Sequence, residues 1–162
     1  QMCIRDSIRL GCKFAILGSG EKIYEDFFSE MHYRYPDRVG LTIGFVPELS
    51  KKIYAGADMF LMPSQSEPCG LAQMIALRYG TIPIVRETGG LRDSIHDAGD
   101  KNGNGFTFKS YNAHDMLDAV VRARAYYDDK MKWGRLVNTA LKQNFSWTKP
   151  AKDYLALYND IH

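Results

Sequence analysis

The fold is decided by residues 58–85, which read DMFLMPSQSEPCGLAQMIALRYGTIPIV. Residues 58–62 are a short apolar run followed by a proline, which predicts a buried strand. A helix is predicted from Pro68 to Tyr79, because proline suits a first helical turn and Gly80 is a typical helix stop. Residues 82–85 are apolar again and predict the next strand. This order predicts two parallel strands joined by a crossover helix.

The same alternation continues on both sides of this unit. Further strands are predicted at residues 13–17, 39–45 and 105–108, and further helices at residues 24–35 and 47–56. The predicted strands are continuously apolar, so helices must cover both faces of the sheet. The sequence therefore predicts an α/β fold with a doubly wound, Rossmann-like parallel sheet, followed by C-terminal helices over residues 112–162.

Residues 1–7, QMCIRDS, differ from the rest of the chain. They show no clear period and no helix cap, and we interpret them as a non-native or disordered leader. A frayed native helix end is the alternative interpretation. Residues 8–162 are predicted to form one domain, in keeping with the total length of 162 residues.

Composition excludes several classes of partner. The 21 Lys and Arg residues balance 19 Asp and Glu residues, so no basic excess favours nucleic acid as a partner. No apolar run approaches the ~18 residues of a membrane span. Three cysteines without a Cys-x-x-Cys pair predict neither a disulfide framework nor a zinc site. We therefore expect a cytoplasmic domain without a membrane, nucleic-acid or metal partner.

Two further patterns suggest ligands without specifying them. Gly18 and Gly20 satisfy half of the dinucleotide pattern G-x-G-x-x-G, but Ile23 occupies its third glycine position. Phe45 stands where an acidic residue would hold the ribose, so NAD is disfavoured and no cofactor is predicted. The glycine loop fits a simple turn and a loop over a phosphate equally well. Residues 100–105 mimic the start of a calcium loop, but its bidentate glutamate is missing, which favours a polar turn.

The segment Ser64–Leu71 follows a predicted strand, at the edge of the sheet where ligands bind in such folds. With Pro68 in the first helical turn, the free N–H groups of residues 69–71 are expected to point outward. They carry the positive end of the helix dipole, which suits a phosphate or electron-rich hydroxyls. Glu67 either stabilises this dipole or contacts a ligand, and its place before a glycine-bearing helix start favours the ligand.

Three short strings of this sequence occur together in one enzyme family. They are Pro63-Ser64-x-x-Glu67-Pro68-Cys69-Gly70-Leu71-x-Gln73, Tyr79-Gly80-x-x-Pro83-Ile84-Val85 and Thr88-Gly89-Gly90-Leu91-x-Asp93. The chain resembles the bacterial glycogen synthase and plant starch synthase family from about Lys13 to the C-terminus. Most other retaining glycosyltransferases of the same fold have a second glutamate eight positions after the first. Ile75 holds that position here, which favours the glycogen and starch branch.

The resemblance implies a retaining hexosyltransferase of the two-domain GT-B fold, with residues 8–162 as its C-terminal, nucleotide-sugar-binding domain. Such an enzyme transfers glucose from ADP-glucose or UDP-glucose to the non-reducing end of an α-1,4-glucan. By the same resemblance, the catalytic residue is Glu67, which would hold the hydroxyls of the donor glucose. The other implied donor contacts are Gly18, Phe45 against the nucleobase, Ser64, the N–H groups of Cys69, Gly70 and Leu71, and a wall of Thr88, Gly89 and Gly90.

The chain also departs from the family pattern. Ala72 stands where relatives often have a phosphate-contacting threonine. The family's Arg/Lys pair and its N-terminal acceptor domain have no counterpart in these residues. Two hypotheses follow: a fragment of a glucan synthase that is inactive alone, or a stand-alone, non-catalytic module that binds a nucleotide or nucleotide sugar. The apolar face of the final predicted helix, suited to a partner, favours the fragment.

Overall fold

Strand β4 (Ile82–Arg86) forms the centre of the larger sheet in the computed structural model, which describes residues 2–161. It pairs in parallel with β3 (Met59–Met62) on one side and with β5 (Phe106–Phe108) on the other. Four of its five residues are buried, as expected for a strand covered on both faces. The strand–helix–strand unit predicted from residues 58–85 is thus confirmed.

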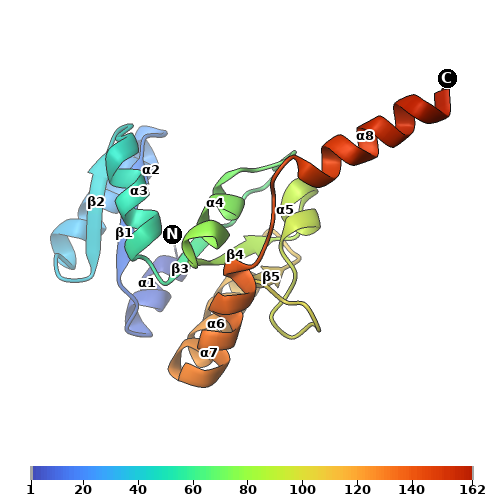
Figure 1. The fold of residues 1–162 in the computed structure, drawn as a ribbon. Coiled ribbons are helices and arrows are strands. Elements are labelled where there is room, and N and C mark those ends of the chain that lie inside the picture. The colour runs from blue at the N-terminus through green and yellow to red at the C-terminus, as the bar shows by residue number, and fades with distance from the viewer. Residues whose placement is uncertain (1, 162) are drawn as a thin grey trace.

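A second parallel sheet joins β1 (Phe14–Gly18) to β2 (Val39–Ile43). Helix α2 (Lys22–Arg34) packs on this pair and contributes Phe27 and Met31 to a small core. The sequence predicts one continuous sheet, whereas the structure has one sheet of two strands and one of three (Figure 1). Within the described residues, β1 and β3 share no hydrogen-bonded register, although all the strand pairs are parallel.

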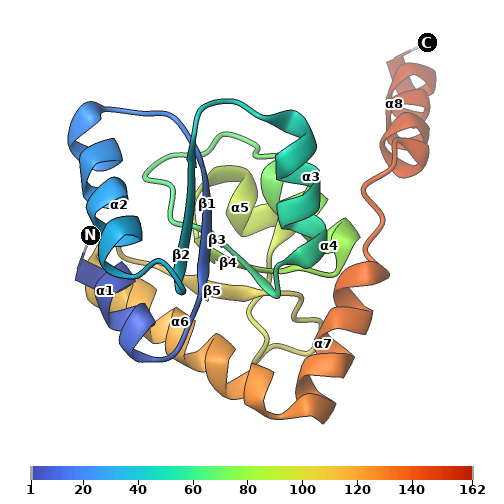
Figure 2. The ribbon, with the colours of Figure 1, turned by 90° about the vertical axis from the view of Figure 1, so that its left-hand side faces the viewer.

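Helices surround the larger sheet and complete its core (Figure 2). They are α4 (Ala72–Tyr79), α5 (Gly89–Ser94), α6 (Ala113–Asp128) and α7 (Lys130–Leu141), while α3 (Pro47–Gly56) contacts α4 and contributes no residue to this core. The sequence analysis did not predict α5, which has only six residues and shows no hydrophobic period. Asn112 caps α6 by accepting a hydrogen bond from the Asp115 amide at 2.9 Å.

Helix α3 connects the smaller sheet to the larger one. The Tyr54 ring stacks on Tyr79 of α4 with the ring centres 6.2 Å apart, and it lies 5.3 Å from the ring of Phe60. The Thr81 hydroxyl donates to the backbone oxygens of Tyr54, at 2.5 Å, and Ala57, at 3.0 Å. The end of α3 is therefore fixed against β3 and α4, at the edge of the sheet where β3 and β4 begin.

Helix α1 (Met2–Arg9) contains most of the residues that the sequence analysis set apart as a leader. It packs against α6, Ser7 is buried, and the Arg5 guanidinium lies 5.6 Å from the centre of the Phe27 ring. Residues 2–7 are thus helical in the structure. Their assignment as a non-native leader stays a prediction.

Helix α8 (Thr148–Ile161) extends away from the rest of the molecule (Figure 1). Its large apolar side chains are all exposed: Tyr154, Leu155, Leu157, Tyr158 and Ile161. Among residues 2–161, no helix is both long and apolar enough to cross a membrane.

Candidate donor-binding site

The loop between β3 and α4 contains Glu67 and the glycine string, and its shape differs from the prediction. The helix begins at Ala72, not at Pro68, and Leu71 is its N-cap residue. Gly70 has φ +72°, a left-handed conformation that favours glycine and that cannot belong to a right-handed helix. Pro68 therefore lies in the loop, and residues 69–71 precede the helix.

Backbone carbonyl oxygens of this loop accept hydrogen bonds from three residues: Arg86, Gly90 and Gln73. The Arg86 side chain donates to the oxygen of Ser64 at 3.0 Å and also to that of Gln65. The Gly90 amide donates to the oxygens of Glu67 and Pro68, both at 3.2 Å. The Gln73 side chain donates to the oxygens of Cys69 at 3.1 Å and Gly70 at 2.9 Å, and the Leu71 oxygen accepts from the Ile75 amide as α4 begins.

This arrangement fixes the direction of the loop's N–H groups. In a trans peptide the carbonyl and the following N–H point in opposite directions. Because the oxygens of residues 68, 69 and 70 point into the protein, the N–H groups of Cys69, Gly70 and Leu71 point away from it. No hydrogen bond within residues 2–161 uses any of these three N–H groups. The N–H groups thus point outward, as predicted from the sequence. The cause is different: the hydrogen bonds to the carbonyl oxygens orient them, not a helix start at Pro68.

The Glu67 side chain is half-buried and unused by the fold. Within residues 2–161 its carboxylate takes part in no hydrogen bond and no ion pair. A carboxylate beside three unpaired N–H groups presents strong acceptors and strong donors on one surface. Such a surface can bind hydroxyl groups and a phosphate together.

Gly89 and Gly90 pack directly under this loop. A Cβ at Gly89 would collide with the backbone oxygen of Glu67, and one at Gly90 would collide with the oxygen of Cys69 and lie 2.6 Å from its Cα. Only glycine permits this approach, so the Thr88–Gly90 segment supports the loop from below. The structure thus brings Thr88, Gly89 and Gly90 beside Glu67.

We expect the substitution Gly90→Ala to destabilise the chain by about 2–3 kcal/mol, because the added methyl group overlaps backbone atoms that cannot rotate away. Gly134→Ala is the matched control. Gly134 lies inside α7 with no atom within 4 Å of a new Cβ, and alanine there should stabilise the helix by up to ~1 kcal/mol. Urea denaturation midpoints measure both effects. A Gly90→Ala chain as stable as the wild type would contradict the packing described above.

A polar network braces the residue before Thr88. The Thr107 hydroxyl donates to the Glu87 carboxylate at 2.7 Å, and the Thr107 amide donates to Asp97 at 2.9 Å. Arg122 of α6 donates to Asp97 at 2.7 Å and to the Thr107 backbone oxygen at 2.6 Å. Burial alone would raise the pKa of Asp97, but the hydrogen bonds from Arg122 and Thr107 outweigh it and hold the pKa below its usual value. The charged Asp97–Arg122 pair therefore holds Thr107 of β5, and the Thr107 hydroxyl connects β5 to Glu87 at the end of β4.

The other two predicted contacts lie at the ends of β1 and β2. The Gly44 amide donates to the backbone oxygen of Gly18 at 2.9 Å, so the loops after these strands start side by side. Phe45 follows Gly44 and is 91% exposed, which excludes a place in the core and leaves its ring free for a ligand. Its contact with a nucleobase stays a prediction.

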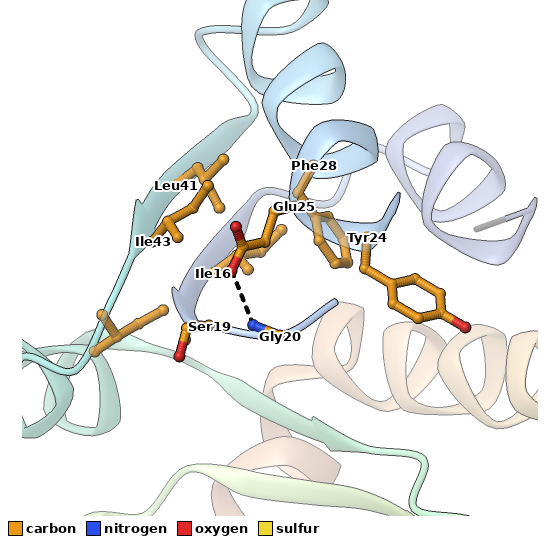
Figure 3. Close-up of a pocket in the computed structure, with 10 residues that line it drawn as sticks. Ile16, Ser19, Gly20, Tyr24, Glu25, Phe28, Leu41 and Ile43 are labelled. Carbon is orange, nitrogen blue, oxygen red and sulfur yellow. Dashed lines mark hydrogen bonds between the residues drawn. The ribbon is translucent and has the colours of Figure 1, made fainter. Parts of the chain in front are cut away.

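A pocket of about 180 Å³ lies beneath the Gly18–Gly20 loop, between α2 and the first two strands (Figure 3). Its walls are mostly apolar, with Ile16, Phe28 and Leu41 among them. The Glu25 carboxylate accepts a hydrogen bond from the Gly20 amide at 2.9 Å. That amide is therefore occupied by the protein, which favours a turn at this position over a phosphate contact.

Sequence reasoning assigned no role to Arg86, Gln73 or Ser94. Arg86 gave a signal, since an arginine at the end of a buried strand must direct its donors to nearby oxygens. Gln73 was part of a recognised string, but its partners Cys69, Gly70 and Ser94 could be found only from the structure.

The parallel sheets and their flanking helices place the chain in the doubly wound α/β class, in which ligands bind at the loops after the strands. The chain belongs to the family of glycosyl transferases group 1, whose family model matches residues 5–135. The predicted glycosyltransferase family is thereby confirmed, and the parallel sheets flanked by helices confirm the α/β, Rossmann-like fold.

Within this family the chain is similar in sequence to glycogen synthases and in sequence and structure to a starch synthase. It is 53% identical to the glycogen synthase of Anoxybacillus flavithermus over 90% of its length, and 51% identical to that of Desulforudis audaxviator over 97%. The solved catalytic domain of starch synthase IV from Arabidopsis thaliana, bound to ADP and acarbose, matches 98% of the chain with a TM-score of 0.87 and 39% identity. The chain spans about a third of these proteins: 31% and 32% of the two glycogen synthases and 34% of the starch synthase chain.

Proposed function

We propose that this chain is the donor-binding part of a glycogen or starch synthase. The complete enzyme transfers glucose from a nucleoside diphosphate glucose to the non-reducing end of an α-1,4-glucan, with retention. The observation that carries the proposal is the loop of residues 64–71. Its carbonyl oxygens accept hydrogen bonds from Arg86, Gly90 and Gln73, whereas the Glu67 carboxylate and three N–H groups are unused within the described residues. The similarity to glycogen synthases over at least 90% of the chain supports the same conclusion.

In this proposal Glu67 accepts hydrogen bonds from the hydroxyls of the donor glucose and stabilises positive charge on the sugar as the bond to phosphate breaks. The N–H groups of Cys69, Gly70 and Leu71 bind the diphosphate, on which negative charge develops. Thr88, Gly89 and Gly90 form the adjoining wall.

The nucleotide end of the donor would lie on the ends of β1 and β2. Phe45 stacks on the base with its exposed ring, and Gly18 allows the backbone to approach the nucleotide. An aromatic ring stacks on adenine or uracil, so this contact does not choose between the two bases. The ADP in the starch synthase structure supports ADP-glucose as the donor.

The glucan acceptor would be held by an N-terminal domain outside this chain, as the family resemblance implies. The exposed apolar face of α8 supports such a partner, because side chains such as Leu155 and Tyr158 have no covering surface within residues 2–161. A cytoplasmic location, with no membrane or nucleic-acid partner, completes the proposal.

A domain-replacement experiment tests this function against the alternative of a binding module without catalysis. This chain is substituted for the segment that it matches in the Anoxybacillus flavithermus glycogen synthase. We expect the hybrid enzyme to transfer labelled glucose from ADP-glucose to glycogen, because all donor contacts proposed above lie in the substituted segment. A folded hybrid that binds ADP but transfers no glucose would favour the binding module.

A further inference from the structure

Gln73 links the two loops of the candidate site. It lies in the first turn of α4 and is 0% exposed. Its Nε2 is within hydrogen-bond reach of three acceptors: the backbone oxygens of Cys69, at 3.1 Å, and Gly70, at 2.9 Å, and the hydroxyl of Ser94, at 3.1 Å. The Ser94 hydroxyl donates in turn to the Gly90 oxygen at 2.6 Å. One side chain therefore connects the Glu67 loop to the glycine segment beneath it.

These acceptors fix the orientation of the amide. If the amide were turned over, its oxygen would face two carbonyl oxygens, and the one nearby hydroxyl already donates to Gly90. In the observed orientation Oε1 is buried and has no hydrogen-bond partner within residues 2–161. It lies under Gly70, where a Cβ would be only 2.5 Å from it.

A buried carbonyl without a partner opposes folding, whereas an apolar side chain of the same length would fill this space without that penalty. The amide is thus a poor choice for stability alone. Its two N–H groups, one of them shared with the Ser94 hydroxyl, nevertheless hold the oxygens of Cys69 and Gly70, and through the trans peptide they set the direction of the next two N–H groups. Those are the N–H groups of Gly70 and Leu71, which face away from the protein.

We propose that Gln73 is a positioning residue for the donor diphosphate: it holds the Cys69–Leu71 backbone so that two N–H groups are oriented before the ligand binds. This inference rests on the function proposed above. A loop that is already ordered loses less conformational freedom on binding, so the tether raises affinity for the diphosphate without touching it. Ser94 extends the tether to the glycine segment.

The test is the substitution Gln73→Met, which removes the donors and keeps the length of the side chain. We expect the dissociation constant of the chain for ADP to rise roughly tenfold to a hundredfold, because two N–H contacts to a charged group lose their orientation. The ¹⁵N order parameters of Gly70 and Leu71 should fall from rigid values toward about 0.6 in the free chain. The melting temperature should stay within about 3 °C of the wild type, a margin that separates positioning from general support of the fold.

Two further variants keep the test decisive. Ser94→Ala removes only the outer link and should raise the dissociation constant roughly threefold, even if Gln73→Met does not fold. Gln143→Met is the control, since Gln143 lies just beyond the end of α7 and the only hydrogen bond of its side chain within the described residues runs to the Thr139 oxygen. In the hybrid synthase, Gln73→Met should raise the KM for ADP-glucose more than it lowers kcat.

The proposal is overturned if Gln73→Met leaves both the order parameters of the loop and the affinity for ADP at wild-type values. Failure of the proposed function looks different, because then the wild-type chain itself would not bind ADP. In that case the order parameters of Gly70 and Leu71 still decide whether Gln73 holds the loop.

Discussion

A hybrid synthase that carries Glu67→Ala is expected to lose glucose transfer by at least ~100-fold while its thermal stability changes little. The loss of two hydrogen bonds that the carboxylate accepts from sugar hydroxyls, at about 1.5–3 kcal/mol each, accounts for an effect of this size. The fold does not need the side chain, because the Glu67 carboxylate has no hydrogen bond or ion pair within residues 2–161. We therefore expect a stability change below ~1 kcal/mol.

The control for Glu67→Ala is another glutamate-to-alanine substitution, away from the candidate site. Glu30→Ala is suitable, since Glu30 lies on α2 and forms an exposed ion pair with Arg34 at 2.5 Å. It should leave transfer unchanged. Turnover and melting temperature are measured for both variants. If Glu67→Ala keeps its activity and instead lowers the melting temperature sharply, Glu67 is a structural residue and the proposed role is wrong.

The second large effect concerns the chain alone, which we expect to bind nucleotide but not to transfer glucose. The departing nucleoside diphosphate gains negative charge, and a helix start with its adjoining N–H groups supplies only about half a unit of positive charge. The family resemblance places a basic pair outside this chain, and the loss of one such electrostatic partner typically costs about 3–4 kcal/mol. Without an acceptor domain the glucan hydroxyl is not positioned, which can cost a further ~7–11 kcal/mol.

Those losses put transfer by the isolated chain below detection. The measurement supplies the purified chain with labelled ADP-glucose and UDP-glucose together with glycogen, and counts label in the polymer. The matched control is the same chain carrying Glu67→Ala. Label above that control would show that the 162 residues form a complete catalyst and that the fragment hypothesis is wrong.

The strands were predictable because their signal is local. A run such as residues 82–85 is apolar at every position, and the structure has β4 at Ile82–Arg86. Helix α5 gave no comparable signal, since six residues are too few to show a period. The division into two sheets also lies beyond local pattern, because it depends on which strands pair with one another across the chain.

The start of α4 shows how one residue type can mislead. Proline in a first helical turn is a good general rule, and it led to Pro68 as the start. Gly70, with φ +72°, interrupts any helix that would begin there, and the helix starts at Ala72. The predicted direction of the N–H groups of residues 69–71 nevertheless agrees with the structure, because these groups point outward for a different reason. The hydrogen bonds from Gln73 and Gly90 to the loop's carbonyl oxygens orient them. The Gly90 contact could not be inferred from the spacing of residues 63–73, because Gly90 lies outside that segment.

A crystal structure of this chain with ADP-glucose bound tests the central claim most directly. We predict glucose hydroxyls within about 2.7–3.2 Å of the Glu67 carboxylate and diphosphate oxygens at similar distances from the N–H groups of Cys69, Gly70 and Leu71. The adenine should stack on the ring of Phe45, which is exposed and free to receive it. A nucleotide bound elsewhere, with Glu67 facing only solvent and Phe45 uncovered, would contradict the claim.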